Sequence, residues 1–230
     1  MVIKWLGHAC FLITSEAGTR IITDPFDETV GYVVPSQEAD IVTVSHDHFD
    51  HNAVKFVKGS PVVVRSPGEH RVKGAKGEEI EITGLACWHD EVRGAKRGPN
   101  VVFKLKMDGL SVVHMGDIGH VLGSDTVKAI GQVDVLLVPV GGTYTVDAEG
   151  AAAIVGELKP KVVIPMHYKT PVMNFPITTA EPFLKKMSNV KKPGGTLVQI
   201  TQESLKELLK DTKQGQEGRQ GPVVIMLDYE

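Results

Sequence analysis

The segment with the clearest capacity for chemistry runs from His46 to His51 in the pattern H-x-H-x-D-H, with three imidazoles and a carboxylate at its lettered positions. Imidazole and carboxylate groups suit zinc, manganese and iron. Two histidines in alternation on extended backbone send their side chains to one side of the chain, and the other two groups lie on the turn beyond. The spacing therefore favours a site for two metal ions.

Three further candidates lie at the ends of other predicted strands. His89, Asp117 and His167 each follow an apolar, strand-like run. Taken singly, a histidine or aspartate in such a place is more often a capped turn or a hydrogen-bonded surface residue. Together with the first motif they predict one site that several strand ends build.

The elements that must position these residues differ between the two halves of the chain. The first half reads as short strands with turns between them, and one short helix follows the histidine motif. Its strands are expected at Val2–Trp5, Cys10–Thr14, Thr19–Thr23, Ile41–Val44, Pro61–Arg65, Glu79–Thr83, Leu85–Trp88, Val101–Met107 and Leu110–His114, and its helix at Asn52 to about Lys58. Asp108-Gly109 is a tight hairpin signal.

The second half alternates helices and strands, which is an α/β rhythm. Helices are expected at Ser124–Ile130, Ala148–Leu158 and Thr179–Met187, and strands at Val133–Val140, Lys161–Pro165 and Thr196–Ile200. Asp147 is a predicted N-cap, and Thr178 with Glu181 a predicted capping box.

The last thirty residues differ in kind from the rest, which suggests a main domain at 1–200 and an appendage at 201–230. Leu205, Leu208 and Leu209 form one apolar face of a short helix. Lys213 to Gly221 reads as a polar linker. Val223–Leu227 is expected to add an edge strand, and its pairing with a neighbouring subunit would make a homo-oligomer.

Composition and charge set limits on function. The chain has 230 residues, 42% of them apolar, and a net charge of −3, so a strongly basic nucleic-acid binder is excluded and no long nucleic acid is an expected partner. No run approaches the ~18 apolar residues of a membrane span. The two cysteines, Cys10 and Cys87, are too few for a thiolate zinc site and read as buried apolar side chains. A reducing, cytoplasmic location is expected.

Several motifs, in order along the chain, resemble the metallo-β-lactamase superfamily from Trp5 to about Gly195. They are Trp5-Leu6-Gly7-His8-Ala9, Asp24-Pro25-Phe26, Ser45 to His51, Trp88-His89, Gly116-Asp117, Gly141-Gly142 before Tyr144-Thr145, and Ile164-Pro165-Met166-His167-Tyr168. The branch most resembled includes the ascorbate-6-phosphate lactonases and relatives of the N-acyl-phosphatidylethanolamine-hydrolysing phospholipases. The resemblance implies a four-layer αββα sandwich with a dinuclear metal site at one edge of its two sheets.

The resemblance also implies roles for seven residues. One metal would be held by His46, His48 and His89, the second by Asp50, His51 and His167, and the carboxylate of Asp117 would bridge them. Two cations that share a water lower its pKa and yield a hydroxide nucleophile near neutral pH. Asp50 is the expected catalytic residue, which orients the nucleophile or accepts its proton.

Five other residues are candidates for substrate contact or for support of the ligands. His8 would line the pocket, support a ligand or make a plain structural hydrogen bond, and His114 would orient a ligand or be a satisfied core histidine. His120, Thr143 and Tyr144 follow strand ends on the same edge and would contact substrate or pack loops.

Departures from other branches narrow the function. Di-iron oxygen reductases carry a glutamate at the position of His48, common β-lactamases use a cysteine ligand that this chain lacks, and RNA-processing relatives need an extra arm or domain. We therefore expect a hydrolase of a small phosphodiester, a phosphorylated lactone or a related small-molecule ester, with two manganese or zinc ions or, less favoured, iron. The alternatives are a metal-binding protein with little catalysis and a mononuclear iron thiol oxygenase.

Overall fold

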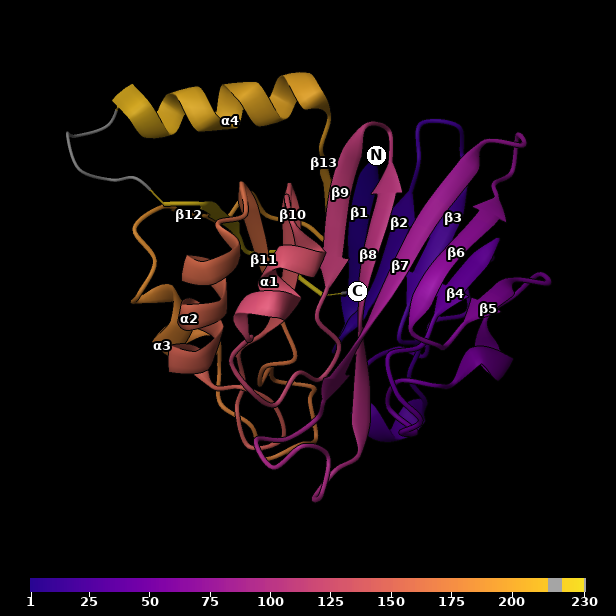
Figure 1. Cartoon of the computed structure of the whole chain (residues 1–230), viewed down its shortest axis with the longest axis horizontal. Coiled ribbons are helices and arrows are strands. Elements are labelled where there is room, and N and C mark those ends of the chain that lie inside the picture. Colours follow the sequence, from indigo (N-terminus) through magenta and orange to yellow (C-terminus); the bar gives the residue numbers. More distant parts are fainter. Residues whose placement is uncertain (215–220, 230) are drawn as a thin grey trace.

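The computed structural model describes residues 1–214 and 221–229 and consists of two β-sheets packed face to face (Figure 1). The first sheet has the order β13-β1-β2-β3-β4-β5 and the second β12-β14-β11-β10-β9-β8-β7-β6. The strands of the first sheet are β1 Val2–Gly7, β2 Cys10–Thr14, β3 Arg20–Thr23, β4 Ile41–Thr43, β5 Val62–Val64 and β13 Leu197–Gln199. Those of the second are β6 Gly68–Lys73, β7 Glu79–Trp88, β8 Pro99–Met107, β9 Leu110–His114, β10 Val135–Pro139, β11 Val162–Met166, β12 Val190–Lys191 and β14 Val223–Ile225.

Alternation of side chains along the first sheet creates two apolar layers. Ile3, Phe11 and Ile21 belong to the large core that the two sheets enclose. Their neighbours in sequence face the other way, because successive strand residues alternate between faces, and Cys10 and Ile22 join a second, smaller core. Both faces of this sheet are therefore covered.

The second sheet holds the α/β part of the chain. Strands β9, β10 and β11 run parallel, and helices α1 (Ser124–Ile130) and α2 (Ala148–Leu158) form the crossovers between them. Every residue of β10 and β11 is buried, as expected for parallel strands with a sheet on one face and helices on the other. The side chain of Asp147 caps α2 as predicted, by accepting hydrogen bonds from the backbone N–H groups of Glu149 and Gly150. Together with the family comparisons below, this two-sheet architecture confirms the predicted fold class.

The antiparallel part of the second sheet corrects two expectations and confirms a third. Strand β6, which carries His70, was not expected, because its charged residues hide the strand pattern. The two strands expected at 79–83 and 85–88 form the single strand β7. Its central Gly84 has no room for a side chain, because a Cβ there would lie 2.6 Å from the carbonyl oxygen of Ser66, just before β6. Asp108 and Gly109 make the tight turn between β8 and β9, both with positive φ, as predicted.

Helical cover is thin over the outer face of the first sheet. The helix expected at Asn52–Lys58 is a single 3₁₀ turn, Val54–Phe56, and a second turn forms at Glu28–Val30. Loops cover this face instead, through apolar side chains such as Phe26, Tyr32 and Met173. The helix expected at Thr179–Met187 shortens to α3, Glu181–Leu184; Thr178 does not cap it but donates its hydroxyl to the Gly141 carbonyl.

The C-terminal strand does not lie at an edge, contrary to the prediction. β14 pairs in parallel with β11 on one side and with β12 on the other, so it is an inner strand of its own chain's sheet. Helix α4, Gln202–Gln214, lies across one end of the sandwich (Figure 1), and it includes the first two residues of the expected linker, whose residues 215–220 lie outside the described part. Within the described residues, no helix combines the length and the apolar character that a membrane crossing needs.

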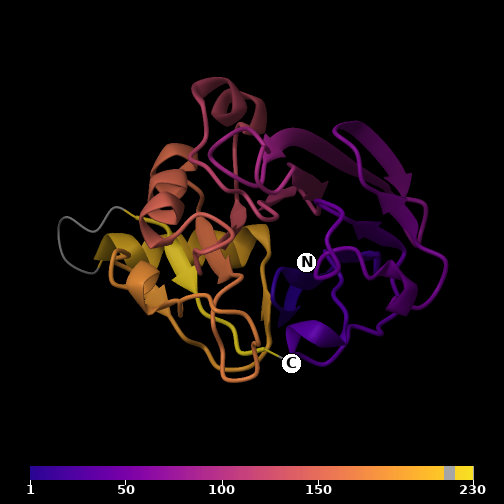
Figure 2. The same cartoon turned by 90° about the horizontal axis from the view of Figure 1, so that it is seen from below.

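The candidate residues follow six strands whose carboxyl ends lie at one end of the sandwich. β1, β3 and β4 run in the same direction in the first sheet, and β7, β9 and β11 do so in the second. Figure 2 looks onto the end opposite α4, where these strands finish. The residues that follow these strand ends, within a few positions, are His8, Asp24, the motif from His46 to His51, His89, Asp117 and His167.

Candidate metal centre

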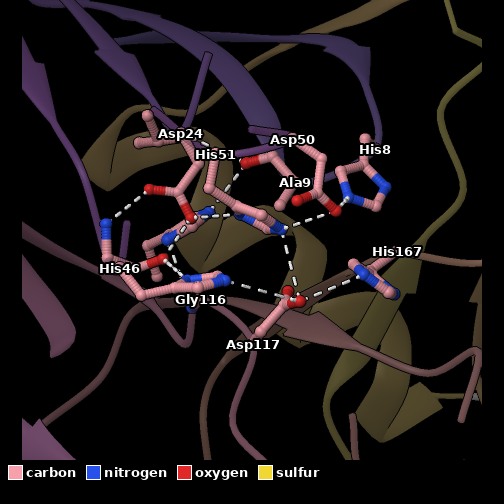
Figure 3. Close-up of polar contacts among 12 residues, drawn as sticks. His8, Ala9, Asp24, His46, Asp50, His51, Gly116, Asp117 and His167 are labelled. Carbon is pink, nitrogen blue, oxygen red and sulfur yellow. Dashed lines mark hydrogen bonds and ion pairs between the residues drawn. The ribbon is translucent and has the colours of Figure 1, made fainter. Parts of the chain in front are cut away.

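Asp117 lies at the middle of the site. Its Oδ2 atom is 3.2 Å from Nε2 of His51, 3.2 Å from Nε2 of His167 and 3.3 Å from Nε2 of His89. Nε2 of His46 lies 4.0 Å away. Figure 3 shows the rings of His46, His51 and His167 turned toward this carboxylate. One carboxylate thus faces four histidines from three different loops.

The potential ligands divide into two main groups on either side of Asp117. His46, His48 and His89 form one group, and Asp50, His51 and His167 form the other together with His8; in each, the potential ligand atoms lie within 4.8 Å of one another. These are the sets that the sequence assigned to two metals, with His8 added. Nε2 of His8 is 3.1 Å from Oδ2 of Asp50, so this histidine supports the carboxylate directly.

The unpaired polar atoms of the site show that cations fit it. Nε2 of His46, Nε2 of His51 and Oδ1 of Asp117 are buried and have no hydrogen-bond partner. Such atoms are costly in a protein interior unless a ligand binds them. Neutral imidazoles and ionised carboxylates are also the donor types that divalent transition metals accept. The cluster is therefore able to bind metal.

The electrostatics of the cluster act differently on its individual imidazoles and carboxylates. Burial lowers the pKa of His46 to about 3 and that of His8 to about 4, so both imidazoles stay neutral. Burial alone would raise the pKa of Asp117, but the imidazoles of His167 and His51 hold it well below its usual range. The pKa of His51 is raised well above its ordinary value, against the effect of burial, because the Asp117 and Asp50 carboxylates lie beside it.

Asp24 is a functional residue that the sequence analysis did not assign to the site. It is fully buried, and its Oδ2 accepts a hydrogen bond of 2.8 Å from Nδ1 of His51, which fixes the tautomer that leaves Nε2 free. Its Oδ1 accepts a 2.7 Å bond from the backbone N–H of Ser45, at the start of the motif. One carboxylate thus orients the ring and holds the loop.

Asn100 is a second supporting residue that the sequence analysis did not assign to the site. As with Asp24, its hydrogen-bond partners are distant in sequence. Its side-chain oxygen accepts a 2.9 Å hydrogen bond from the backbone N–H of Asp117, and its amide donates to the carbonyl of Met115. Gly116 lets this happen: a Cβ there would lie 2.4 Å from the Asn100 oxygen and 2.6 Å from Cβ of Ser45. The loop that carries Asp117 is therefore fixed from both sides.

Three residues of the candidate metal centre also have a strained backbone conformation. His8, Asp24 and His167 all have positive φ, at 52°, 39° and 50°. Residues other than glycine adopt this conformation at a cost and are enriched at functional sites. The fold holds these three side chains in place against a local preference.

The two remaining histidine candidates lie outside the ligand groups. His114 is a satisfied core histidine: its Nε2 donates to the Ala9 carbonyl at 2.8 Å and its Nδ1 accepts a bond from the Gly116 N–H. His114 therefore helps to hold the loop that carries Asp117, and neither of its ring nitrogens is free to bind a metal. His120 packs a loop, with its Nδ1 bonded to the carbonyl of Val121 and its Nε2 to the N–H of Trp88.

Thr143, Tyr144 and Lys169 belong to the loops around the centre. The hydroxyl of Thr143 donates to the carbonyl of Pro176 at 3.0 Å, and the ring of Tyr144 contacts Phe175 edge-on. Lys169 is half-buried and donates to the carbonyls of Met173 and Phe175. It holds a loop and is not a free anion-binding group.

Comparison with known proteins identifies the family. A family model described as the β-lactamase superfamily domain matches residues 2–167, more than two thirds of the chain. The chain belongs to the metallo-β-lactamase superfamily. Within the superfamily, it is 32% identical over 209 residues to a UPF0173 metal-dependent hydrolase of Archaeoglobus fulgidus, a match that covers 79% of this chain and 87% of the relative. A protein of the same description from Thermoplasma acidophilum is also 32% identical, over 78% of this chain and 87% of the relative.

A solved structure of a superfamily member extends the match to the whole chain. It comes from Thermotoga maritima, is assigned to the Zn-dependent hydrolases of this superfamily, and is 35% identical with a TM-score of 0.76. The match covers 100% of this chain and 99% of the other. The protein is therefore a metal-dependent hydrolase of the metallo-β-lactamase superfamily with a histidine and aspartate cluster able to bind metal.

Proposed function

We propose that the protein is a dinuclear hydrolase that cleaves a small phosphodiester, a phosphorylated lactone or a related ester. The observation that carries this proposal is the position of the Asp117 carboxylate between two groups of three or more potential ligands. His46, His48 and His89 would hold one ion, Asp50, His51 and His167 the other, and Asp117 would bind both. Manganese and zinc suit these nitrogen and oxygen ligands, as does iron.

Divalent cations at these residues would lower the pKa of a bound water toward neutrality and offset negative charge that develops on a substrate oxygen. The chain's own residues supply position and proton transfer. Asp50 is the more accessible carboxylate of the two, with 11% of its side chain accessible against 3% for Asp117. A water that enters the site therefore meets Asp50, whose carboxylate orients it and accepts its proton.

His8 and Asp24 act on this arrangement indirectly. His8 holds Asp50 through the contact of 3.1 Å between Nε2 and Oδ2, and Asp24 holds His51 through Nδ1. Such supporting contacts typically affect metal affinity or activity by ~10–100-fold. They position the groups that would touch metal and substrate.

The first experiment is the hydrolysis of bis-p-nitrophenyl phosphate by protein loaded with manganese or zinc, beside a count of bound metal per chain. We expect a metal-dependent rate that Asp50→Ala lowers by at least about two orders of magnitude. Asp47→Ala is the matched control, because Asp47 lies in the same loop but is exposed. Near wild-type rates in metal-loaded Asp50→Ala would remove the catalytic role of Asp50.

Other outcomes separate the alternatives. Two bound manganese or zinc ions with no phosphodiester hydrolysis would point to lactones and carboxylic esters as the next substrates to test. One bound iron with oxygen uptake in the presence of a thiol would replace the hydrolase with an oxygenase. Cys10 and Cys87 are both buried and free, which supports a reducing compartment, and we propose the cytoplasm.

A further inference from the structure

Exposed apolar side chains are concentrated around the metal centre. Nine large apolar side chains are exposed among the described residues, and three of them, Val62, Val63 and Leu197, lie on the edge strands β5 and β13. Trp88 is the last residue of β7, and four others, Phe49, Val92, Val121 and Val172, lie on loops that follow strands at the end of the sandwich that carries the cluster. Val33 lies on the connection between β3 and β4. Contiguous apolar surface beside a polar site usually marks a place where a ligand binds.

Several of these side chains are next to ligand positions in the sequence. Phe49, with 52% exposure, stands between His48 and Asp50. Trp88, with 41% exposure, directly precedes His89. The positions of these residues are therefore fixed by the same strand ends and turns that fix the metal ligands.

Three aromatic side chains form a continuous surface on the side of Asp50 and His167, which we call the aromatic wall: Phe49, Tyr144 and Phe175. The ring of Phe175 is central and makes edge-on contacts at 6.2 Å with Phe49 and 6.1 Å with Tyr144. The same ring lies 5.6 Å from the ring of His8, which belongs to the second ligand group. The wall therefore adjoins the place where the reacting group would bind.

The loop that carries Phe175 is held in place without a ligand. The ammonium group of Lys169 donates to the carbonyls of Met173 and Phe175, and Asn174 donates its side-chain amide to the carbonyl of Thr29. The hydroxyl of Thr143 donates to the carbonyl of Pro176. A surface fixed in this way loses little conformational entropy when a ligand binds.

Arg97 places a positive charge at the far end of the wall. Its guanidinium lies over the ring of Tyr144 at 5.4 Å and donates to the carbonyl of Thr143 at 3.1 Å. That is its one hydrogen bond to the described residues, whereas a guanidinium has five N–H donors. Arg97 can therefore bind an anionic group that lies beside the wall.

Asp90 builds the loop that presents Arg97. Its carboxylate is buried and accepts hydrogen bonds from the backbone N–H groups of Val92, Gly94, Lys96 and Arg97. Two of these N–H groups donate to each carboxylate oxygen, so the loop closes around this one side chain. The position of Arg97 is thus part of the fold.

We propose that the substrate is an amphiphilic ester: its scissile group lies at the metal ligands, an apolar aryl or acyl group packs on Phe49 and Phe175, and a second anionic group binds Arg97. This proposal rests on the proposed function for the position of the scissile group. A small, purely polar substrate would leave the wall exposed to water. An apolar group of the substrate that packs on the wall removes that surface from water. The positive charge of Arg97 then sets the orientation of the bound substrate.

The experiment measures binding rather than turnover, so that it does not depend on hydrolysis. Three stable phosphonates are titrated calorimetrically into metal-loaded protein: methylphosphonate, phenylphosphonate and 4-phosphonobenzoate. We expect phenylphosphonate to bind about tenfold more tightly than methylphosphonate, because the ring covers apolar surface. The added carboxylate of 4-phosphonobenzoate should tighten binding by about threefold more through Arg97.

Variants assign these differences to residues. Phe49→Ala and Phe175→Ala should each lower the advantage of phenyl over methyl to less than about threefold, whereas Leu197→Ala, which truncates an equally exposed side chain on β13, should not. Arg97→Gln should remove the advantage of the carboxylate, and Lys96→Gln, on the same loop, should retain it. Phe49 is exposed, so its truncation tests the wall even where Phe175→Ala does not fold.

Two results would overturn the proposal. The first is equal affinity for the methyl and phenyl ligands, or no binding of any of the three. The second is binding of the protein to phosphatidylcholine vesicles that Phe49→Ala abolishes, because the apolar loops would then contact a lipid surface. Loss of hydrolysis with an intact phenyl preference would count against the proposed function alone.

Discussion

Buried aspartates at the two ends of the sandwich have opposite surroundings. At the end near α4, Asp134 is 4% exposed and fully paired: one oxygen accepts from the N–H and hydroxyl of Ser111, and the other from the ammonium of Lys161 at 2.7 Å. At the other end, Asp117 is 2% exposed, faces four imidazoles, and has an oxygen with no hydrogen-bond partner. Both carboxylate oxygens of Asp134 thus accept hydrogen bonds, whereas one oxygen of Asp117 accepts none.

The two aspartates therefore differ in their expected contributions to the stability of the fold and to metal binding. A buried carboxylate with all its hydrogen bonds made contributes to the folded state, whereas one with an unpaired oxygen costs free energy until a ligand binds. The positive φ angles of His8, Asp24 and His167 add to that cost at the metal end. The opposite end, with its satisfied hydrogen bonds and its tight Asp108-Gly109 turn, helps to offset it.

The largest expected effect comes from one substitution made at both ends. Asp117→Asn should lower the hydrolytic rate by about a thousandfold or more, because both metal groups lose their shared ligand. The melting temperature of the metal-free variant should not exceed that of the wild type, because the substitution also removes the favourable contact of the Asp117 carboxylate with the imidazoles of His51 and His167. Rates and melting temperatures of the metal-loaded and metal-free variant check this.

The matched variant, Asp134→Asn, should affect stability alone. Its rate per folded molecule should equal that of the wild type, while its melting temperature falls. Equal loss of rate in both variants would show that Asp117 has no special role.

Asp24→Asn should have an intermediate effect at the metal end. Asparagine keeps only one of the two acceptor oxygens that Asp24 uses, so Nδ1 of His51 or the N–H of Ser45 loses its acceptor, and metal affinity should fall by ~10–100-fold. Titration of metal into the apoprotein measures this directly. Asp40→Asn is the control, because Asp40 pairs with Arg20 at the surface, away from the centre. Unchanged affinity in Asp24→Asn would mean that packing alone orients His51.

The sequence was sufficient to predict the metal-ligand candidates but not their supports. His46 to His51, His89 and His167 follow β-branched or apolar strands directly, and this local pattern is visible without knowledge of the fold. Asp24 and Asn100 support them through partners 17 to 27 residues away, so their roles depend on which strands are neighbours. No local pattern carries that information.

The strands, too, were predictable only where their pattern is local. The parallel strands β10 and β11 are continuous apolar runs and were predictable, whereas β6 has only Val72 buried and has no clear strand pattern. The inner position of β14 depends on β12, a strand of two residues that aligns beside it. Sheet order is set by such tertiary contacts, which local propensity does not describe.

The smallest expected effect is the pH dependence of stability at the satisfied end. Burial acts to raise the pKa of Asp134, but its bonds to Lys161 and Ser111 hold it below the ordinary value. A carboxyl whose folded-state pKa is depressed contributes stability above its unfolded pKa of about 4, and this contribution is lost as the pH falls through the folded-state value. Asp134→Asn should therefore lower the free energy of unfolding by about 1–3 kcal/mol at pH 7 and by progressively less below pH ~4.

Urea unfolding of both proteins from pH 7 to pH 3 measures this difference. Asp125→Asn is the control, because the side chain of Asp125 is 99% exposed and its contact with Lys128 spans 3.9 Å. Such a surface pair contributes ~1 kcal/mol or less, so the control should follow the wild type at every pH. A constant difference between wild type and Asp134→Asn down to pH 3 would assign the stabilisation to the shape of the side chain rather than to its charge, and the contrast between the two ends would then concern packing alone.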